Sequence, residues 1–149
     1  MSVSFGKIPL SISPIFWVTA GLIGFVNAGS LVGTLIWMFV IFISVLVHEL
    51  GHAITSMFFG QKPTVALVAL GGVTSYQGKP LKFWQQFVVV FNGPLFGLLL
   101  FVFSALVLKA NIFENMAVIS ILQVMKWVNL FWSLVNLLPI LPLDGGQLL

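Results

Sequence analysis

Four long apolar runs, separated by short polar or glycine-containing segments, are the most regular pattern along the chain. They cover residues 12–27, 31–59, 83–108 and 116–138. A helix of roughly 20 apolar residues is long enough to cross the hydrocarbon core of a bilayer. The pattern therefore predicts an all-α membrane core of about four transmembrane helices.

Residues 2–13 alternate between polar and apolar side chains instead of extending the first run. Alternation with a period of two is typical of a strand, so we expect a strand that leads into the first helix. A cleaved signal peptide is the alternative, because Lys7 precedes an apolar stretch. We reject that alternative because the sequence offers only a poor cleavage site.

The segment between the second and third runs has the pattern of a β-hairpin. Residues 64–70 are rich in branched side chains, Gly71 and Gly72 can form a turn, and residues 73–77 alternate. We expect the N-terminal strand to be able to join this hairpin in a small sheet. A bare hairpin is marginal in water and unacceptable in lipid, so it must lie at the interface or in a protein-lined cavity.

The composition excludes several classes of protein. The chain has 149 residues, of which 60% are hydrophobic and 6% charged, whereas a soluble domain carries about 25% charged residues. We interpret residues 1–149 as a single core domain embedded in the lipid bilayer. There is no cysteine, so disulfides and thiolate metal sites are excluded. No basic cluster is interleaved with polar surface, and we therefore predict no binding of nucleic acid.

The net charge of +3 comes from six lysines without arginine, and their positions predict an orientation. If the four runs cross alternately, Lys109 falls on one side beside Glu114. The other side then receives Lys7, Lys62, Lys79 and Lys82. Because positive residues favour the cytoplasm, we expect the N-terminus, the hairpin and the C-terminal segment to lie on the cytoplasmic side.

The second run contains the only two histidines of the chain, in the sequence H-E-L-G-H. On a helix, His48 and His52 lie one turn apart on the same face, where both imidazoles can bind one tetrahedral metal ion. Glu49 can then accept a proton from the metal's water. The alternative is that the histidines hydrogen-bond across helices and Glu49 pairs with a lysine. Ionisable groups inside a membrane are costly and are usually functional.

A catalytic zinc ion needs a third protein ligand, and the remaining acidic residues are Glu114 and Asp144. Asp144 follows the fourth run on the predicted cytoplasmic side, where the histidines also lie. Glu114 precedes that run on the opposite side, so only Asp144 is expected to reach the ion. Pro139 and Pro142 break the helix before it, and the following Gly-Gly pair allows the backbone to fold back.

These motifs resemble the site-2 protease family of intramembrane zinc metalloproteases, of bacterial or archaeal type. The resemblance rests on "HELGH" at 48–52 and "NLLPILPLDGG" at 136–146, and it extends to "KIPLSISPIFW" at 7–17 and "FNGPLFGLLL" at 91–100. One departure is visible: where many relatives have an asparagine after G-P, this chain has Gly97, and Asn92 precedes the motif. The chain ends directly after the second motif, so we expect either a truncated core or a very small member of its class.

The resemblance implies a Zn²⁺ ion held by His48, His52 and Asp144, with Glu49 as the catalytic acid and base. It also implies that Asn136 clamps an extended substrate backbone. The predicted activity is hydrolysis of peptide bonds within or near membrane segments, with transmembrane or signal-peptide-like proteins as substrates. Oligomers and regulatory membrane proteins are further partners that the sequence leaves open.

The substrate must unwind before attack, because the peptide groups of a transmembrane helix are occupied by their own hydrogen bonds. The hairpin around Gly71 and Gly72 offers a strand edge to which an unwound segment can pair. Alternatively, the hairpin only plugs the cavity or anchors the protein at the interface.

Polar residues of the fourth run recur at three- and four-residue steps and so share one helical face. This face either lines an aqueous route to the metal or supplies hydrogen bonds between helices. The residues concerned are Lys126, Asn129, Ser133 and Asn136.

Two other kinds of function remain open at this point. A non-proteolytic metal-binding protein such as a metal carrier would need a second set of ligands along its path, and no further histidine or cysteine is present. A purely structural subunit predicts no stoichiometric metal.

Overall fold

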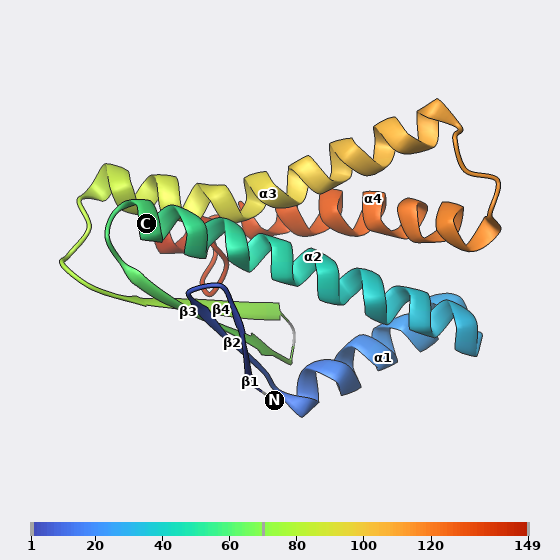
Figure 1. Cartoon of the computed structure of the whole chain (residues 1–149), viewed down its shortest axis with the longest axis horizontal. Coiled ribbons are helices and arrows are strands. Elements are labelled where there is room, and N and C mark those ends of the chain that lie inside the picture. The colour runs from blue at the N-terminus through green and yellow to red at the C-terminus, as the bar shows by residue number, and fades with distance from the viewer. Residues whose placement is uncertain (1, 70, 149) are drawn as a thin grey trace.

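The computed structural model describes residues 2–69 and 71–148, and within them it has four α-helices and one four-stranded sheet (Figure 1). The predicted fold class, a helical membrane core with a small sheet, is confirmed. The elements in chain order are β1 (Ser2–Phe5), β2 (Ile8–Ile12), α1 (Pro14–Ala28), α2 (Leu31–Phe58), β3 (Lys62–Val68), β4 (Gly71–Gln77), α3 (Phe83–Ala110), α4 (Met116–Asn136) and the 3-10 turn η1 (Gly145–Leu148).

Among the described residues, three helices are long and apolar enough to cross a membrane, namely α2, α3 and α4. Helix α1 has 15 residues, which corresponds to roughly 22 Å against the 30 Å of a hydrocarbon core. The first apolar run, predicted over residues 12–27, thus forms a helix that is shorter than the other three, and the prediction of about four helices is confirmed. The helix starts at Pro14 because the backbone N–H of Ser13 still donates to Leu67 in the sheet, and it ends at Gly29, whose φ of 60° is left-handed.

The sheet has the strand order β1-β2-β3-β4. Strands β1 and β2 form an antiparallel hairpin, β2 runs parallel to β3, and β3 pairs antiparallel with β4. The N-terminal segment thus joins the predicted hairpin, as expected. It forms two strands instead of one, because Gly6 adopts a positive φ of 59° and turns the chain between them.

The two glycines of the second hairpin do not form its turn. Gly71 and Gly72 are the first residues of β4, and they pair with Val68 and Leu67 of β3. The prediction of a Gly-Gly turn was therefore wrong, and the glycines extend the strand. Leu70, which the prediction placed in the first strand, lies outside the described residues.

One face of the sheet packs on helices α1 and α2. Burial alternates along β2 and β3, so every second side chain of these strands enters a shared core. Its buried members are Ile8, Leu10, Phe16, Val45, Ala53, Val65 and Leu67. This packing holds the sheet against the half of α2 that carries the histidines.

Helices α2, α3 and α4 contact one another pairwise. Two of the contacts between these helices depend on a glycine that faces the neighbouring helix. A Cβ atom on Gly51 would clash with the backbone of Asn92 in α3, and one on Gly97 would clash with the hydroxyl of Ser133 in α4. Small residues that permit such contact are typical of helix packing in membranes.

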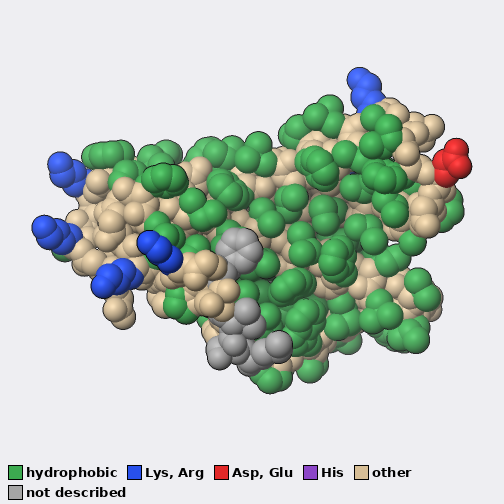
Figure 2. All heavy atoms as spheres, in the orientation of Figure 1, with side chains coloured by type: hydrophobic (Ala, Val, Ile, Leu, Met, Phe, Trp, Pro, Cys, Tyr) green, Lys and Arg blue, Asp and Glu red, His purple; other side chains and the backbone are tan. Residues whose placement is uncertain are grey.

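Hydrophobic side chains cover much of the face of the molecule shown in Figure 2. Large hydrophobic side chains are exposed along all four helices, for example Val26, Leu35, Leu99 and Phe131. Lysine side chains gather at the end of the molecule where the sheet lies, and the acidic side chain visible in this view lies at the opposite end. The chain is accordingly an integral membrane protein, with lipid as the solvent for its helices.

Candidate metal centre

Helix α2 places the two histidines one turn apart in the interior of the bundle. His48 and His52 are both buried, and their Nε2 atoms lie 3.2 Å apart. Their rings meet edge to face with centroids 4.9 Å apart. The helical spacing predicted from the H-E-x-x-H sequence is therefore present, and both ligand atoms point to one place.

Asp144 completes this cluster from the other end of the chain. Helix α4 ends at Asn136, and the chain folds back through a series of tight turns before η1. The Oδ2 atom of Asp144 lies 2.9 Å from Nε2 of His48, and its Oδ1 atom lies 3.3 Å from Nε2 of His52. Glu114, the alternative ligand, is exposed in the loop before α4. The expected choice of Asp144 over Glu114 agrees with this geometry.

The tight fold behind Asp144 depends on the glycine pair that follows it. A Cβ atom on Gly145 would collide with the carbonyl of Leu137, and one on Gly146 would collide with the backbone of Ile140. The two glycines therefore let the returning chain pass directly against the end of α4, which brings Asp144 to the histidines.

A backbone carbonyl sets the tautomer of His52. Its Nδ1 atom donates to the carbonyl oxygen of Val89 in α3, at 2.9 Å. The Nε2 atom of a neutral His52 then carries a lone pair, which is the arrangement that a metal-binding histidine needs. The Nδ1 atom of His48 is buried and has no hydrogen-bond partner in the described part of the chain.

The three side chains fit a bound metal ion. Their ligand atoms all lie within 4.8 Å of one another. Atoms that bind a tetrahedral ion at about 2.0–2.2 Å lie roughly 3.3–3.6 Å apart, so the closest pairs need to separate only slightly. Two imidazoles and one carboxylate are also a donor set that zinc accepts. His48, His52 and Asp144 are thus positioned to bind a metal.

The carboxyl group of Asp144 is held as an anion. Burial acts to raise its pKa, but the imidazoles of His48 and His52, when protonated on Nε2, outweigh burial through hydrogen bonds and charge and lower the pKa to about 2. The ligand is therefore ionised, the state in which a carboxylate binds metal.

Glu49 lies beside this cluster and contacts strand β4. Only 5% of its surface is exposed. Its Oε2 atom accepts a hydrogen bond of 2.7 Å from the hydroxyl of Thr74. The carboxyl group also packs so closely on Gly72 that a Cβ atom there would collide with it. Among the described residues no lysine forms an ion pair with Glu49. The alternative in which Glu49 pairs with a lysine is therefore not supported.

Three contributors to the site were missed by the sequence analysis. They are the hydroxyl of Thr74, the carbonyl of Val89, and Gly93, where a Cβ atom would collide with the imidazole of His52. The G-P motif of the third run could have indicated Gly93. The roles of Thr74 and Val89 have no local signal, because each depends on which segments pack together.

The polar face of α4 contributes mainly to contacts between helices and within α4. Asn129 is buried and donates to the hydroxyl of Ser44 in α2, at 2.8 Å. This contact agrees with the second interpretation of the polar face, as a source of hydrogen bonds between helices. Asn136 is buried at the end of α4 and donates to the carbonyl of Trp132 one turn earlier. Lys126 is half-buried, with its ammonium group 4.7 Å from the ring centroid of Trp127.

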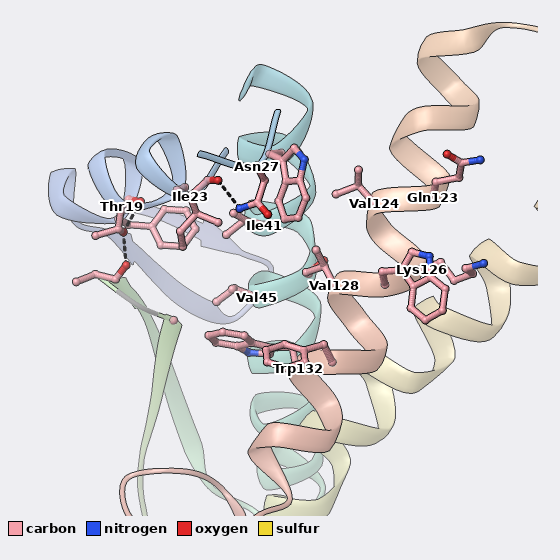
Figure 3. A pocket seen from close by; sticks show the side chains of 18 residues that line it. Thr19, Ile23, Asn27, Ile41, Val45, Gln123, Val124, Lys126, Val128 and Trp132 are labelled. Atoms are coloured by element: carbon pink, nitrogen blue, oxygen red, sulfur yellow. Dashed lines mark hydrogen bonds between the residues drawn. The ribbon is translucent and has the colours of Figure 1, made fainter. Parts of the chain in front are cut away.

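A groove of about 940 Å³ lies between α1, α2 and α4 (Figure 3). Its walls are mostly apolar, with Thr19 and Asn27 on the α1 side and Val124 and Val128 on the α4 side. At one end the groove reaches Trp132 and the start of β4. A polypeptide lying in the groove would therefore reach the strand that contacts Glu49.

Comparison with known proteins agrees with this site. A family described as Peptidase M50B-like matches residues 15–143. The chain is 32% identical to stage IV sporulation protein FB of Bacillus subtilis over 94% of its own length and 46% of that protein. It is 34% identical, over 77% of its length, to a Synechocystis protein that carries a provisional zinc-metalloprotease name, of which it covers 30%.

The fold is also that of a solved structure, the site-2 protease from Methanocaldococcus jannaschii. The two superpose with a TM-score of 0.71 at 20% identity, over 99% of this chain and 69% of the other. The chain belongs to the Peptidase M50B-like family, and the predicted relationship to site-2 proteases is confirmed. It spans less than half the length of the two relatives compared by sequence.

Proposed function

We propose that residues 1–149 form the catalytic core of an intramembrane zinc metalloprotease, which hydrolyses peptide bonds within or near membrane segments of other proteins. The observation that carries this proposal is the convergence of His48, His52 and Asp144 inside the bundle, with Glu49 beside them. The names of the relatives as zinc metalloproteases support zinc as the metal.

The three ligands would hold the ion, and Glu49 would act as acid and base. A bound zinc ion supplies the Lewis acid that activates water and polarises the peptide carbonyl. Glu49 removes one proton from the attacking water, and returns that proton to the leaving nitrogen as the C–N bond breaks. The burial of Glu49, and its place next to His48 on α2, support this role.

Strand β4 is the element that we assign to substrate binding. It is the last strand in the sheet order, so one of its edges has no strand partner among the described residues. An unwound substrate segment can pair with that edge at Gly71 and Gly72. The groove between α1 and α4 leads to this strand and provides a path for the substrate helix. Asn136, which is buried at the end of α4, is assigned to hold the substrate backbone.

The active site is proposed to face the cytoplasm of a prokaryotic cell, in the inner membrane. The support is the distribution of lysines, which lie mainly at the sheet end of the molecule (Figure 2), as expected for the cytoplasmic side. Substrates are proposed to be transmembrane or signal-peptide-like proteins, for which the apolar groove is suited.

The test uses mass spectrometry of membrane peptides incubated with the wild-type protein and with Glu49→Gln, with zinc measured in both. We expect a cut inside an apolar segment that the wild type makes and the variant does not, with equal zinc in the two. A loss of about 10²–10⁴-fold in rate corresponds to the removal of an acid-base group. Undiminished cleavage by Glu49→Gln would rule out this mechanism.

A metal carrier is the competing function, and the same samples distinguish it. The described residues contain a single group of three metal-ligating side chains, whereas a carrier needs successive ligand sets. Metal flux in proteoliposomes without any peptide cleavage would favour the carrier. Absence of stoichiometric metal in the purified protein would favour a structural subunit.

A further inference from the structure

Thr74 is the one described residue whose side chain hydrogen-bonds to the carboxylate of Glu49. Its Oγ1 atom lies 2.7 Å from Oε2 of Glu49, across the contact between β4 and α2. Glu49 is almost fully buried, and a buried carboxylate that lacks hydrogen bonds is destabilised. The threonine hydroxyl therefore holds this group in one orientation.

The hydroxyl proton of Thr74 has two acceptors within reach. The second is the backbone carbonyl of Glu49, at 3.2 Å. The contact with Oε2 is the shorter of the two, at 2.7 Å, so the hydroxyl proton points to Oε2. Gly72 adds a second constraint, because Cγ, Cδ and Oε1 of Glu49 pack on it where a Cβ atom would leave no room, so that Oε1 faces the start of β4.

We propose that Thr74 is a positioning residue for Glu49: by holding Oε2 it assigns the proton transfer to Oε1. This inference rests on the proposed function. Oε1 takes one proton from the attacking water as the new C–O bond forms, and the same oxygen gives that proton to the amide nitrogen as the C–N bond breaks. Thr74 keeps its own proton throughout and does not touch the substrate.

The position of Thr74 in the chain couples two parts of the reaction. The residue belongs to β4, the strand with the free edge, and residues 72, 74 and 76 are less exposed than residues 73, 75 and 77. A substrate that pairs along this edge thus binds the same strand that orients the acid and base. Substrate binding and the alignment of Glu49 are in this way linked through one short strand.

Kinetics of three variants test the role of the hydroxyl. Thr74→Val keeps the shape of the side chain and removes the donor, and Thr74→Ser keeps the donor. We expect Thr74→Val to lower kcat by about 10- to 100-fold, as is usual for a group that orients a catalytic residue, with KM and bound zinc unchanged. Thr74→Ser should stay close to wild type. Thr64→Val, an exposed threonine on β3, is the matched control and should change neither constant.

A spectroscopic measurement tests the contact without relying on activity. The chain has only two glutamates, Glu49 and Glu114, so glutamate labelled with ¹³C at the side-chain carboxyl gives two signals in the metal-free protein. Glu49→Gln assigns them. We expect Thr74→Val to shift the Glu49 signal, and Thr64→Val to shift neither.

The outcomes separate this inference from the proposed function. An unshifted Glu49 signal in Thr74→Val, a kcat equal to wild type, or an equal loss in Thr74→Ser and Thr74→Val would overturn the role of the hydroxyl while leaving the protease standing. A change confined to KM would also overturn it. If Thr74→Val shifts the Glu49 signal but the wild-type protein cleaves no peptide, the proposed function is overturned and the contact between Thr74 and Glu49 still stands.

Discussion

The carboxylate of Asp144 lies 2.9 Å from the Nε2 atom of His48, although the two residues lie far apart in the sequence. One belongs to the middle of a transmembrane helix and the other to the loop after α4. Their meeting depends on the packing of α2, α3 and α4 and on the tight return of the chain at Gly145 and Gly146. The metal centre is therefore a product of the whole bundle.

Asp144→Asn should weaken zinc binding by at least about 100-fold. Mutating a residue that only hydrogen-bonds to a metal ligand already lowers metal affinity by about 10- to 100-fold, and the loss of a ligand itself should cost more. The amide keeps the size of the side chain but lacks its negative charge. Competition with a chromogenic chelator measures the affinity. Glu114→Gln, which removes the exposed acid at the other end of the molecule, is the control and should bind zinc like wild type. Equal affinities for the two variants would contradict the assignment of Asp144.

Gly93→Ala should lower zinc affinity by about 10- to 100-fold, because the new methyl group would displace the imidazole of His52. The protein should remain folded, since the change adds one methyl group to a helix. Gly21→Ala provides a matched control in α1, where the added atom would make only ordinary contact with Met38. Chelator titration of both variants, with thermal melting as a check of folding, measures the effect. Normal affinity in Gly93→Ala would show that the ring of His52 has more room than its contacts indicate.

The hydrogen bond between Asn129 and Ser44 should stabilise the contact between α4 and α2. Removing either partner, in Asn129→Leu or Ser44→Ala, is expected to cost about 0.6–2 kcal/mol of unfolding free energy, the range for such bonds in membranes. A double-mutant cycle in detergent, read by denaturant unfolding, isolates the pair. Additive effects of the two substitutions would mean that Asn129 faces a water-filled route instead of its partner helix.

Removing the metal tests the centre as a whole. We expect a strong chelator to abolish peptide cleavage and added zinc to restore it, because His48, His52 and Asp144 are proposed to hold the ion that activates water. Mass spectrometry of the products after each step is the measurement. Cleavage that persists in a sample shown to be metal-free would exclude a metalloprotease.

Much of this protein was determined by its sequence alone. The length and hydropathy of the apolar runs predicted the helices to within a few residues, because a membrane leaves a backbone few alternatives. The spacing of His48 and His52 predicted a shared helical face, because residues four apart on a helix lie one turn above each other. Asp144 was also predicted, since orientation in the membrane and the scarcity of acidic residues left few other ligands.

The start of the first helix and the contacts that orient Glu49 and His52 could be found only in the folded structure. The first apolar run became a strand end and a short helix because Ser13 bonds to the sheet at Leu67, a contact with a remote segment. The contact of Thr74 with Glu49, and that of Val89 with His52, likewise join segments that packing alone brings together. Hydrophobic pattern and spacing act along the chain, whereas the orientation of each catalytic group depends on its neighbours in space.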